Sequence, residues 1–261
     1  MTLLADLVAG AVEDARIREE SVSLGEVEWK ALAQPPARDA LAALAPGERV
    51  KIIAEIKRAS PSRGDLAAIP DPAKQARLYE EGGASVVSVL TEGRRFKGSL
   101  ADLTAVREAV TLPVLRKDFI ANAYQVFEAR AAGADLVLLI AAALDQQQLT
   151  TLHTLVRELG MTPLVETHSS YEVARAVDVG AELIGVNARD LRTFELDRDL
   201  FGRLVDGIPK SSVAVAESAV QTPADVAHYR AAGADAVLVG EALVTGDPVA
   251  TLRAFLGEDA R

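Results

Sequence analysis

Polar side chains stand at the ends of several short apolar segments of this chain, and their types suit acid–base chemistry. Glu55 and Lys57 close the apolar run 50–54, Lys117 closes 112–115, and Glu166 closes 162–165. Strands buried on both faces read as continuous apolar runs, so a charge belongs where the strand leaves the core. The other residues at such ends are Asn187, Arg189, Glu217, Ser218, Gly240 and Glu241. Carboxylates and amines gathered there can serve as base, acid and charge clamp.

Residue parity indicates which of these side chains point the same way. Glu55 and Lys57 lie two apart on one strand and share a face, either as part of a reactive centre or as a structural salt bridge. Lys117 shares its face with Leu115 and Phe119 by the same rule. The residues expected on the opposite face are Arg116 and Asp118.

Three of these residues are cations in a chain of net charge −10, which points to an anionic ligand. They are Lys57, Lys117 and Arg189. A guanidinium grips a carboxylate through two parallel hydrogen bonds. The alternative for Arg189 is a loop ion pair with Asp190.

The ends of the last two apolar segments suggest a phosphate site, because barrels often bind phosphate with backbone N–H groups of these loops. The candidate residues are Ser218 and Ala219 after the first segment, and Gly240 and Glu241 after the second. Gly240 would let the backbone approach a ligand closely. The alternative is an ordinary loop glycine.

Strands alternate with helices along the chain. Strands are predicted near 50–57, 84–90, 112–117, 134–140, 162–166, 181–187, 212–217 and 235–239. Helices are predicted near 71–82, 99–110, 122–132, 145–160, 169–179, 197–206, 222–232 and 247–257. The expected N-caps are Asp71, Ser99, Asn122, Asp145, Thr222 and Asp247. Helix ends are marked by Gly83, Gly133, Gly180 and Gly233.

Eight strand–helix units in this length favour a closed (β/α)8 TIM barrel with an N-terminal helical extension. Its strands meet at one mouth, where active sites of such barrels lie. An open doubly wound sheet is the alternative, but the first strand lacks the glycine-rich turn of a dinucleotide fold.

Residues 1–49 precede the barrel of residues 50–261, and we expect the two parts to form one structural domain. Residues 1–20 have the pattern of an amphipathic helix, and Gln34-Pro35-Pro36 must interrupt any helix. The extension either plugs the bottom of the barrel or folds over the top and covers the site.

Composition excludes several classes of function. The negative net charge argues against nonspecific nucleic-acid binding, and no apolar run approaches the length of a membrane span. The chain has no Cys, which excludes disulfides and thiolate chemistry. His153, His168 and His228 show no metal-ligand spacing, and no cofactor motif is present. We expect a cytoplasmic monomer without metal or cofactor.

These motifs, in this order, resemble the indole-3-glycerol-phosphate synthase family of tryptophan biosynthesis. The resemblance runs from about residue 50 to 245, and the extra helices before the barrel also fit the family. The matching stretches are 53–62, Leu90-Thr91-Glu92, Phe96-Lys97-Gly98-Ser99, 115–119, Leu164-Val165-Glu166, 185–191, Ala216-Glu217-Ser218 and 238–241.

The resemblance implies a small phosphorylated anion as substrate, 1-(2-carboxyphenylamino)-1-deoxyribulose 5-phosphate. Ring closure, decarboxylation and dehydration would give indole-3-glycerol phosphate, CO2 and water. Lys117 then corresponds to the general acid and Glu166 to the general base. Lys57, oriented by Glu55, corresponds to a residue that clamps the substrate and assists dehydration, and Glu217 to a supporting carboxylate. Substrate-binding positions are Ser60, Phe119, Leu138, Asn187, Arg189 and Ser218, and phosphate-binding positions are Ala219, Gly240 and Glu241.

Ala219 departs from the family pattern, which usually has Gly at this position. An alanine there disfavours the positive φ that brings a backbone N–H toward phosphate. Two rival functions remain, a sugar-phosphate isomerase on the same barrel and a non-catalytic barrel that binds a phosphorylated metabolite. The combination of Glu55, Lys57, Lys117 and Glu166 speaks against both, because neither needs all four.

Overall fold

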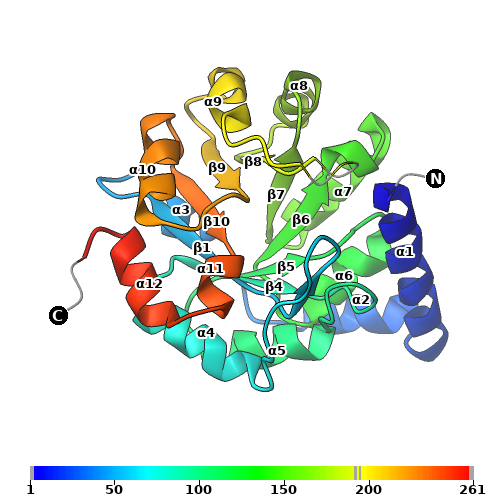
Figure 1. Ribbon diagram of the computed structural model, residues 1–261. Helices are drawn as coiled ribbons and strands as arrows, with labels where there is room; N and C mark the ends of the chain where they lie inside the picture. The colour runs from blue at the N-terminus through cyan, green and yellow to red at the C-terminus, as the bar shows by residue number, and fades with distance from the viewer. Residues whose placement is uncertain (1–2, 191–192, 194, 259–261) are drawn as a thin grey trace.

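Eight parallel strands close into a barrel in the computed structural model, which describes residues 3–190, 193 and 195–258 (Figure 1). The strands are β1 (Lys51–Ile56), β4 (Val86–Leu90), β5 (Val114–Lys117), β6 (Leu136–Ile140), β7 (Thr162–Thr167), β8 (Leu183–Asn187), β9 (Val213–Glu217) and β10 (Ala236–Val239). β1 pairs with both β4 and β10, so the sheet is closed. The barrel prediction is confirmed, and the open-sheet alternative is wrong.

Helices follow the strands around the outside of the barrel. They are α4 (Pro72–Glu81), α5 (Leu100–Ala109), α6 (Ala123–Ala131), α7 (Gln146–Glu158), α8 (Ser170–Asp178), α9 (Leu200–Leu204), α10 (Pro223–Ala231) and α12 (Pro248–Phe255). Every predicted N-cap accepts a backbone N–H from its first turn. The predicted glycines after α4, α6, α8 and α10 all have positive φ. Among the described helices, none is long and apolar enough to cross a membrane.

The structure differs from the prediction in a few short elements. The helix expected over 197–206 is only α9, followed by the 3-10 turn η2 (Val205–Gly207). Asp199 at its start makes no side-chain cap, and Gly202 is a poor helix former. The short elements without a prediction are β2 (Ala59–Ser60), β3 (Gly64–Asp65), η1 (Ala141–Ala143) and α11 (Glu241–Val244). Leu191, part of a quoted motif, lies outside the described residues.

Alternate residues of each strand divide between two cores. Ile53, Leu115 and Leu164 point into the barrel and pack together there. Ile52 and Val165 belong to the second core, between the strands and the outer helices. A side chain in register with the inward set therefore reaches the barrel mouth at the carboxyl end of its strand.

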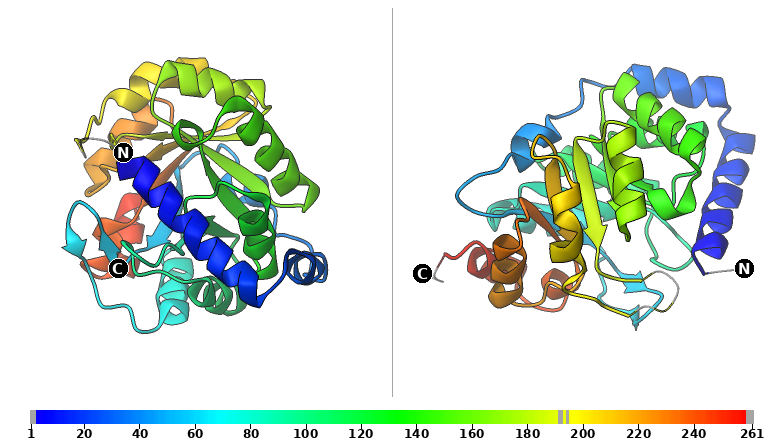
Figure 2. Two further views of the ribbon diagram at one scale, coloured as in Figure 1. Left: turned by 90° about the vertical axis from the view of Figure 1, so that its right-hand side faces the viewer. Right: turned by 90° about the horizontal axis from the view of Figure 1, so that it is seen from above.

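The N-terminal extension contributes to both ends of the barrel. One of its helices fills the amino end, and the first turns of another form part of the cavity wall at the carboxyl end. It comprises α1 (Leu3–Ser21), α2 (Leu24–Leu32) and α3 (Ala40–Leu44), with Pro35 and Pro36 between the last two. α3 joins the interior core at the amino end, where Ala40 and Leu44 are fully buried. α1 lies along the side, with its first turn at the carboxyl-end mouth (Figure 2). α2 packs on α6 between them.

We expect Leu44→Ala to lower the free energy of unfolding by about 2–5 kcal/mol, because a fully buried leucine leaves a cavity when truncated. Urea unfolding followed by circular dichroism measures the change. Leu32→Ala is the matched control, since Leu32 is 68% exposed at the end of α2. Equal effects of the two substitutions would contradict the role of α3 as a plug.

Candidate active site

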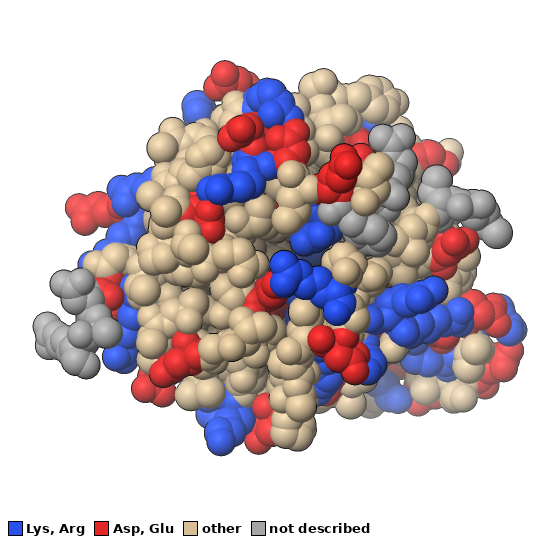
Figure 3. All heavy atoms as spheres, in the orientation of Figure 1, with Lys and Arg blue, Asp and Glu red and all other residues tan. Residues whose placement is uncertain are grey.

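One cavity at the carboxyl ends of the strands collects every site residue singled out in the sequence. Figure 3, which looks onto this end, shows Lys and Arg side chains around a central hollow. The predicted residues in its wall are Glu55, Lys57, Ser60, Lys117, Phe119, Leu138, Glu166, Asn187, Arg189, Glu217, Ser218, Ala219, Gly240 and Glu241. The wall also includes residues that the sequence did not single out as site residues: Leu3, Leu7, Pro61, Ser62, Leu90, Phe96, Asp118, Ile140, Val220, Gln221 and Leu238.

Lys117 lies at the centre of the cavity between two carboxylates from other strands. Its Nζ is 3.3 Å from Glu166 Oε2 and 3.5 Å from Glu217 Oε2. The side chain of Lys117 is 14% exposed, and those of both glutamates are almost fully buried. The amine and the two carboxylates therefore interact in a region where water screens little.

The three groups carry different protonation states because of this crowding. Burial alone would lower the pKa of Lys117, but the surrounding carboxylates raise it above the usual value for lysine. Burial also disfavours the ionised form of Glu166, yet Lys117 brings its pKa below the usual value. For Glu217, burial and then the neighbouring Glu166 charge raise the pKa well above the ordinary range. The arrangement thus holds an ammonium, one carboxylate and one carboxylic acid.

Two glycines make room for the charged side chains. An added Cβ at Gly185 in β8 would lie 2.1 Å from Glu217 Oε1. An added Cβ at Gly240 would lie 2.7 Å from Glu55 Oε1 and 3.0 Å from Lys57 Nζ. The absence of a side chain at Gly240 therefore leaves room for the ends of the Glu55 and Lys57 side chains where they now lie.

Glu55 and Lys57 form an ion pair inside the cavity, with Glu55 Oε1 2.9 Å from Lys57 Nζ. Glu55 is buried, whereas the Lys57 side chain is 20% exposed and reaches the cavity. Burial opposes ionisation of Glu55, but the charges of Lys57 and Lys117 lower its pKa. The pair presents its ammonium on the open side of the site.

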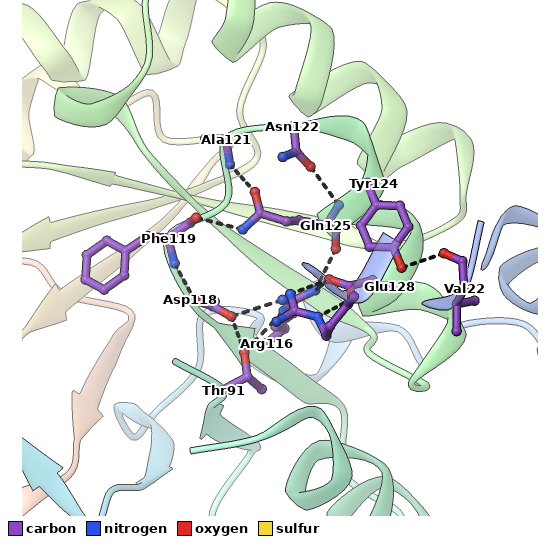
Figure 4. Close-up of polar contacts among 11 residues, drawn as sticks. Val22, Thr91, Arg116, Asp118, Phe119, Ala121, Asn122, Tyr124, Gln125 and Glu128 are labelled. Carbon is purple, nitrogen blue, oxygen red and sulfur yellow. Dashed lines mark hydrogen bonds and ion pairs between the residues drawn. The ribbon is translucent and has the colours of Figure 1, made fainter. Parts of the chain in front are cut away.

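The reverse face of β5 is held by a buried polar network (Figure 4). Arg116 is fully buried and donates to Asp118 Oδ2 at 3.0 Å and to the Gln125 carbonyl at 2.7 Å. Asp118 Oδ1 accepts from the Phe119 N–H, and the Gln125 amide donates to the Phe119 carbonyl. The predicted division of faces is confirmed, since Phe119 points away from this network and Lys117 enters the cavity.

The same network reaches the N-terminal extension. Glu128 in α6 lies 3.5 Å from the Arg116 guanidinium and accepts from Arg18 in α1 at 2.5 Å. The buried charges are thus paired across three elements, as burial requires. The position of α1 is thereby linked to the strand that carries Lys117.

Apolar side chains form another wall of the cavity. Phe119 and Leu138 come from the barrel, while Leu3 and Leu7 come from the first turns of α1. Phe96 lies beside Phe119, with ring centroids 6.2 Å apart. This wall offers a dry surface to an aromatic ring.

The opposite side of the cavity is polar and has a strained backbone. Ser218 and Ala219 both have positive φ, at 69° and 58°. This region costs an L-residue about 1–2 kcal/mol. Asn187 Oδ1 accepts from Ser218 Oγ at 2.8 Å and from the Arg189 N–H at 3.0 Å, which holds the loops after β8 and β9 together. Glu241 pairs with Arg63 at 2.6 Å, so a cation offsets its carboxylate.

Within the described ranges, no group of three or more acidic or histidine side chains is placed to hold a metal ion.

Opposite stability effects are expected from two isosteric substitutions. The raised pKa of Glu217 means that native stability is lost as pH rises above the unfolded value of about 4.3. Glu217→Gln removes that loss. Near neutral pH, its free energy of unfolding should equal that of the wild type or exceed it by about 1 kcal/mol. Glu166 has a lowered pKa and contributes stability above the unfolded value, so Glu166→Gln should lower it.

Urea unfolding of both variants near pH 4 and near pH 7 measures these effects. The Glu217→Gln difference should vanish at the lower pH, where the unfolded chain is also protonated. Equal destabilisation by both substitutions would contradict the assignment of the protonated state to Glu217 and the ionised state to Glu166.

Comparisons with known proteins identify the family of the chain. The chain matches the family model described as Indole-3-glycerol phosphate synthase over residues 4–255. It is 70% identical over 255 residues to an indole-3-glycerol phosphate synthase of Leifsonia xyli subsp. xyli, covering 98% of each chain. It is 57% identical over 249 residues to the Arthrobacter sp. protein of the same name, covering 94% of this chain and 92% of the relative.

Solved structures of lower identity share the fold. N-acetylmannosamine-6-phosphate 2-epimerase from Clostridium perfringens has a TM-score of 0.62 at 14% identity, over 82% of this chain and 94% of its own. 3-hexulose-6-phosphate synthase from Salmonella typhimurium has a TM-score of 0.62 at 16% identity, over 80% of this chain and 97% of its own. These likenesses concern the barrel, whereas the sequence matches concern the family. The chain belongs to the indole-3-glycerol phosphate synthase family.

Proposed function

We propose that this site converts 1-(2-carboxyphenylamino)-1-deoxyribulose 5-phosphate to indole-3-glycerol phosphate, CO2 and water, with Lys117 as general acid and Glu166 as general base. Family membership makes the chain a carboxy-lyase of tryptophan biosynthesis. The observation that carries the assignment of roles is the contact of 3.3 Å between Lys117 Nζ and Glu166 Oε2. It places a protonated amine and an ionised carboxylate side by side in a buried cavity.

The first step needs an acid at a carbonyl oxygen. As the aromatic ring carbon attacks the ketone carbon, the oxygen gains negative charge and takes a proton from Lys117. Lys117 is charged because the surrounding carboxylates hold its pKa up. Its position between Glu166 and Glu217 fixes the direction of the N–H bonds before the substrate binds. CO2 then leaves from the ring carbon that made the new bond, and the electrons of the broken C–C bond restore the aromatic ring.

The later steps need a base and a second acid. The hydroxyl formed at the former ketone leaves as water, and Lys57 faces the cavity to donate its proton. Glu55 orients Lys57 at 2.9 Å. Glu166 removes the proton whose loss makes the five-membered ring aromatic. A carboxylate whose pKa is lowered by Lys117 is ionised and available for this step. Protonated Glu217 supports the pair without adding a second negative charge.

The remaining side chains suit the two ends of the substrate. Phe119 and Leu138 would flank the benzene ring on the apolar wall and exclude water from the decarboxylation. The strained backbone at Ser218 and Ala219, with the loop at Gly240 and Glu241, would take the phosphate. The remaining candidates for binding the substrate's carboxylate and hydroxyl groups are Ser60, Asn187 and Arg189.

The direct test is to mix purified protein with the substrate and follow indole fluorescence. Growth of fluorescence supports the synthase. Calorimetric binding without turnover would instead support a barrel that only binds a phosphorylated metabolite.

Lys117→Ala should lower kcat by at least about a thousandfold while KM changes little, because the ammonium acts mainly when charge develops on the carbonyl oxygen. Steady-state kinetics of the fluorescence assay separate the two constants. Lys30→Ala is the control, since Lys30 is exposed on α2 and pairs with Glu26 at 2.8 Å, outside the cavity wall. A variant at Lys117 that raised KM alone would assign the acid role to another residue.

Ala219→Gly should lower KM for the substrate, because glycine adopts φ near 58° without strain and lets the loop adjust to the phosphate. The same kinetics measure the effect, with inorganic phosphate as a competitive inhibitor reporting on the loop alone. An unchanged or higher KM would show that the methyl group costs nothing in binding.

A further inference from the structure

His168 lies directly behind the proposed general base, in the loop between β7 and α8. Its imidazole lies between two carboxylates, with Nε2 3.4 Å from Glu166 Oε1 and Nδ1 3.3 Å from Glu172 Oε2. The His168 side chain is 14% exposed. Its Nε2 is buried and forms no hydrogen bond with any of the described residues, so its contact with Glu166 is a close approach without hydrogen-bond geometry. The imidazole therefore links the end of β7 to the first turn of α8.

Glu172 is itself fixed by local hydrogen bonds. Its Oε2 accepts from the His168 backbone N–H at 2.8 Å, and its Oε1 accepts from Ser169 Oγ at 3.2 Å. Ser169 is the N-cap of α8 and accepts in return from the Glu172 N–H. The carboxylate that faces Nδ1 thus has one position, determined by the start of the helix.

The proton count at the imidazole follows from these contacts. Facing the Glu172 carboxylate, Nδ1 carries a hydrogen. A neutral ring would then turn the Nε2 lone pair toward Glu166 Oε1, which would be repulsive. The approach is favourable when Nε2 also carries a hydrogen, because the ring is then an imidazolium that attracts the Glu166 carboxylate.

The charged groups around the ring agree with that state. Glu172 from α8, Glu166 from β7 and Lys117 from β5 face it. Burial lowers the pKa of His168, and Lys117 lowers it further. The hydrogen bond to Glu172 and the Glu166 charge raise it by more, so the net pKa is above the usual value.

We propose that His168, held by Glu172, is a positioning residue that orients Glu166 and keeps it ionised as the general base. The two oxygens of Glu166 are then divided, with Oε1 held by His168 and Oε2 beside Lys117 at the substrate. The proposal rests on the proposed function, because it concerns the base of that reaction. Neither His168 nor Glu172 lines the cavity, so both act through Glu166.

The test is the pH profile of kcat for His168→Leu, His168→Gln and Glu172→Gln. In His168→Leu, the acid limb should move up by about one pH unit and kcat should fall by about tenfold, with KM nearly unchanged. Gln retains a neutral N–H toward Glu166, so His168→Gln should recover part of kcat while its acid limb stays shifted. Glu172→Gln should shift the limb in the same direction, and adding it to His168→Leu should change nothing further.

His228→Gln is the matched control, because His228 also contacts a carboxylate, with Nε2 3.3 Å from Asp199 Oδ1, but lies outside the cavity wall. Its profile should match that of the wild type. A wild-type acid limb in every folded His168 variant would overturn the proposal and leave the synthase intact. Absence of turnover in the wild type would overturn both.

Discussion

The structure depends on the burial of the Lys117 ammonium between two carboxylates. A buried charge is tolerated only when it is paired, and Lys117 is paired by carboxylates from β7, two strands away, and from β9, on the opposite side of the barrel. Two carboxylates beside one amine cannot both be ionised cheaply, so one of them retains a proton. The same constraint therefore supplies the ammonium and the ionised carboxylate that the proposed reaction uses as acid and base.

The surrounding scaffold accommodates this cluster at several points. Gly185 in β8 and Gly240, directly after β10, leave space that a Cβ would fill. Gly185 keeps its place in the ladder between β7 and β8. Behind β5, the buried Arg116 network fixes the backbone on either side of Lys117 and extends to Arg18 in α1. Because α1 also supplies Leu3 and Leu7 to the cavity, the extension is connected to the site both electrostatically and by packing.

The barrel and most of the polar site can be predicted from the sequence. Both follow from two patterns: side chains alternate in direction along a strand, and polar residues end the apolar runs. Inward-facing residues of parallel strands must converge, so charges that end separate apolar runs had to meet. The predicted starts of seven of the eight strands lie one or two residues early, because apolar residues such as Val50 lead into a strand before its ladder begins. The helix over 197–206 was overestimated because a cap and propensity were both lacking at Asp199 and Gly202.

The site residues that escaped prediction reach the mouth by tertiary packing. In the sequence, Leu3 and Leu7 resemble the apolar face of any amphipathic helix, and only the course of α1 places them at the cavity. The sequence also could not assign the extension to one end of the barrel, because its helices contribute to both. His168 follows Thr167 and has no local signal, since its role depends on a ring placed between β7 and α8. Residues at strand ends line the cavity and can be predicted from the sequence. Residues such as His168, which contact those side chains from behind, are positioned by loops and cannot. The charge state of Glu166 therefore depends partly on His168 and Glu172, which lie outside the cavity. No sequence pattern identifies residues of this kind, because their contacts depend on how the loop after β7 packs.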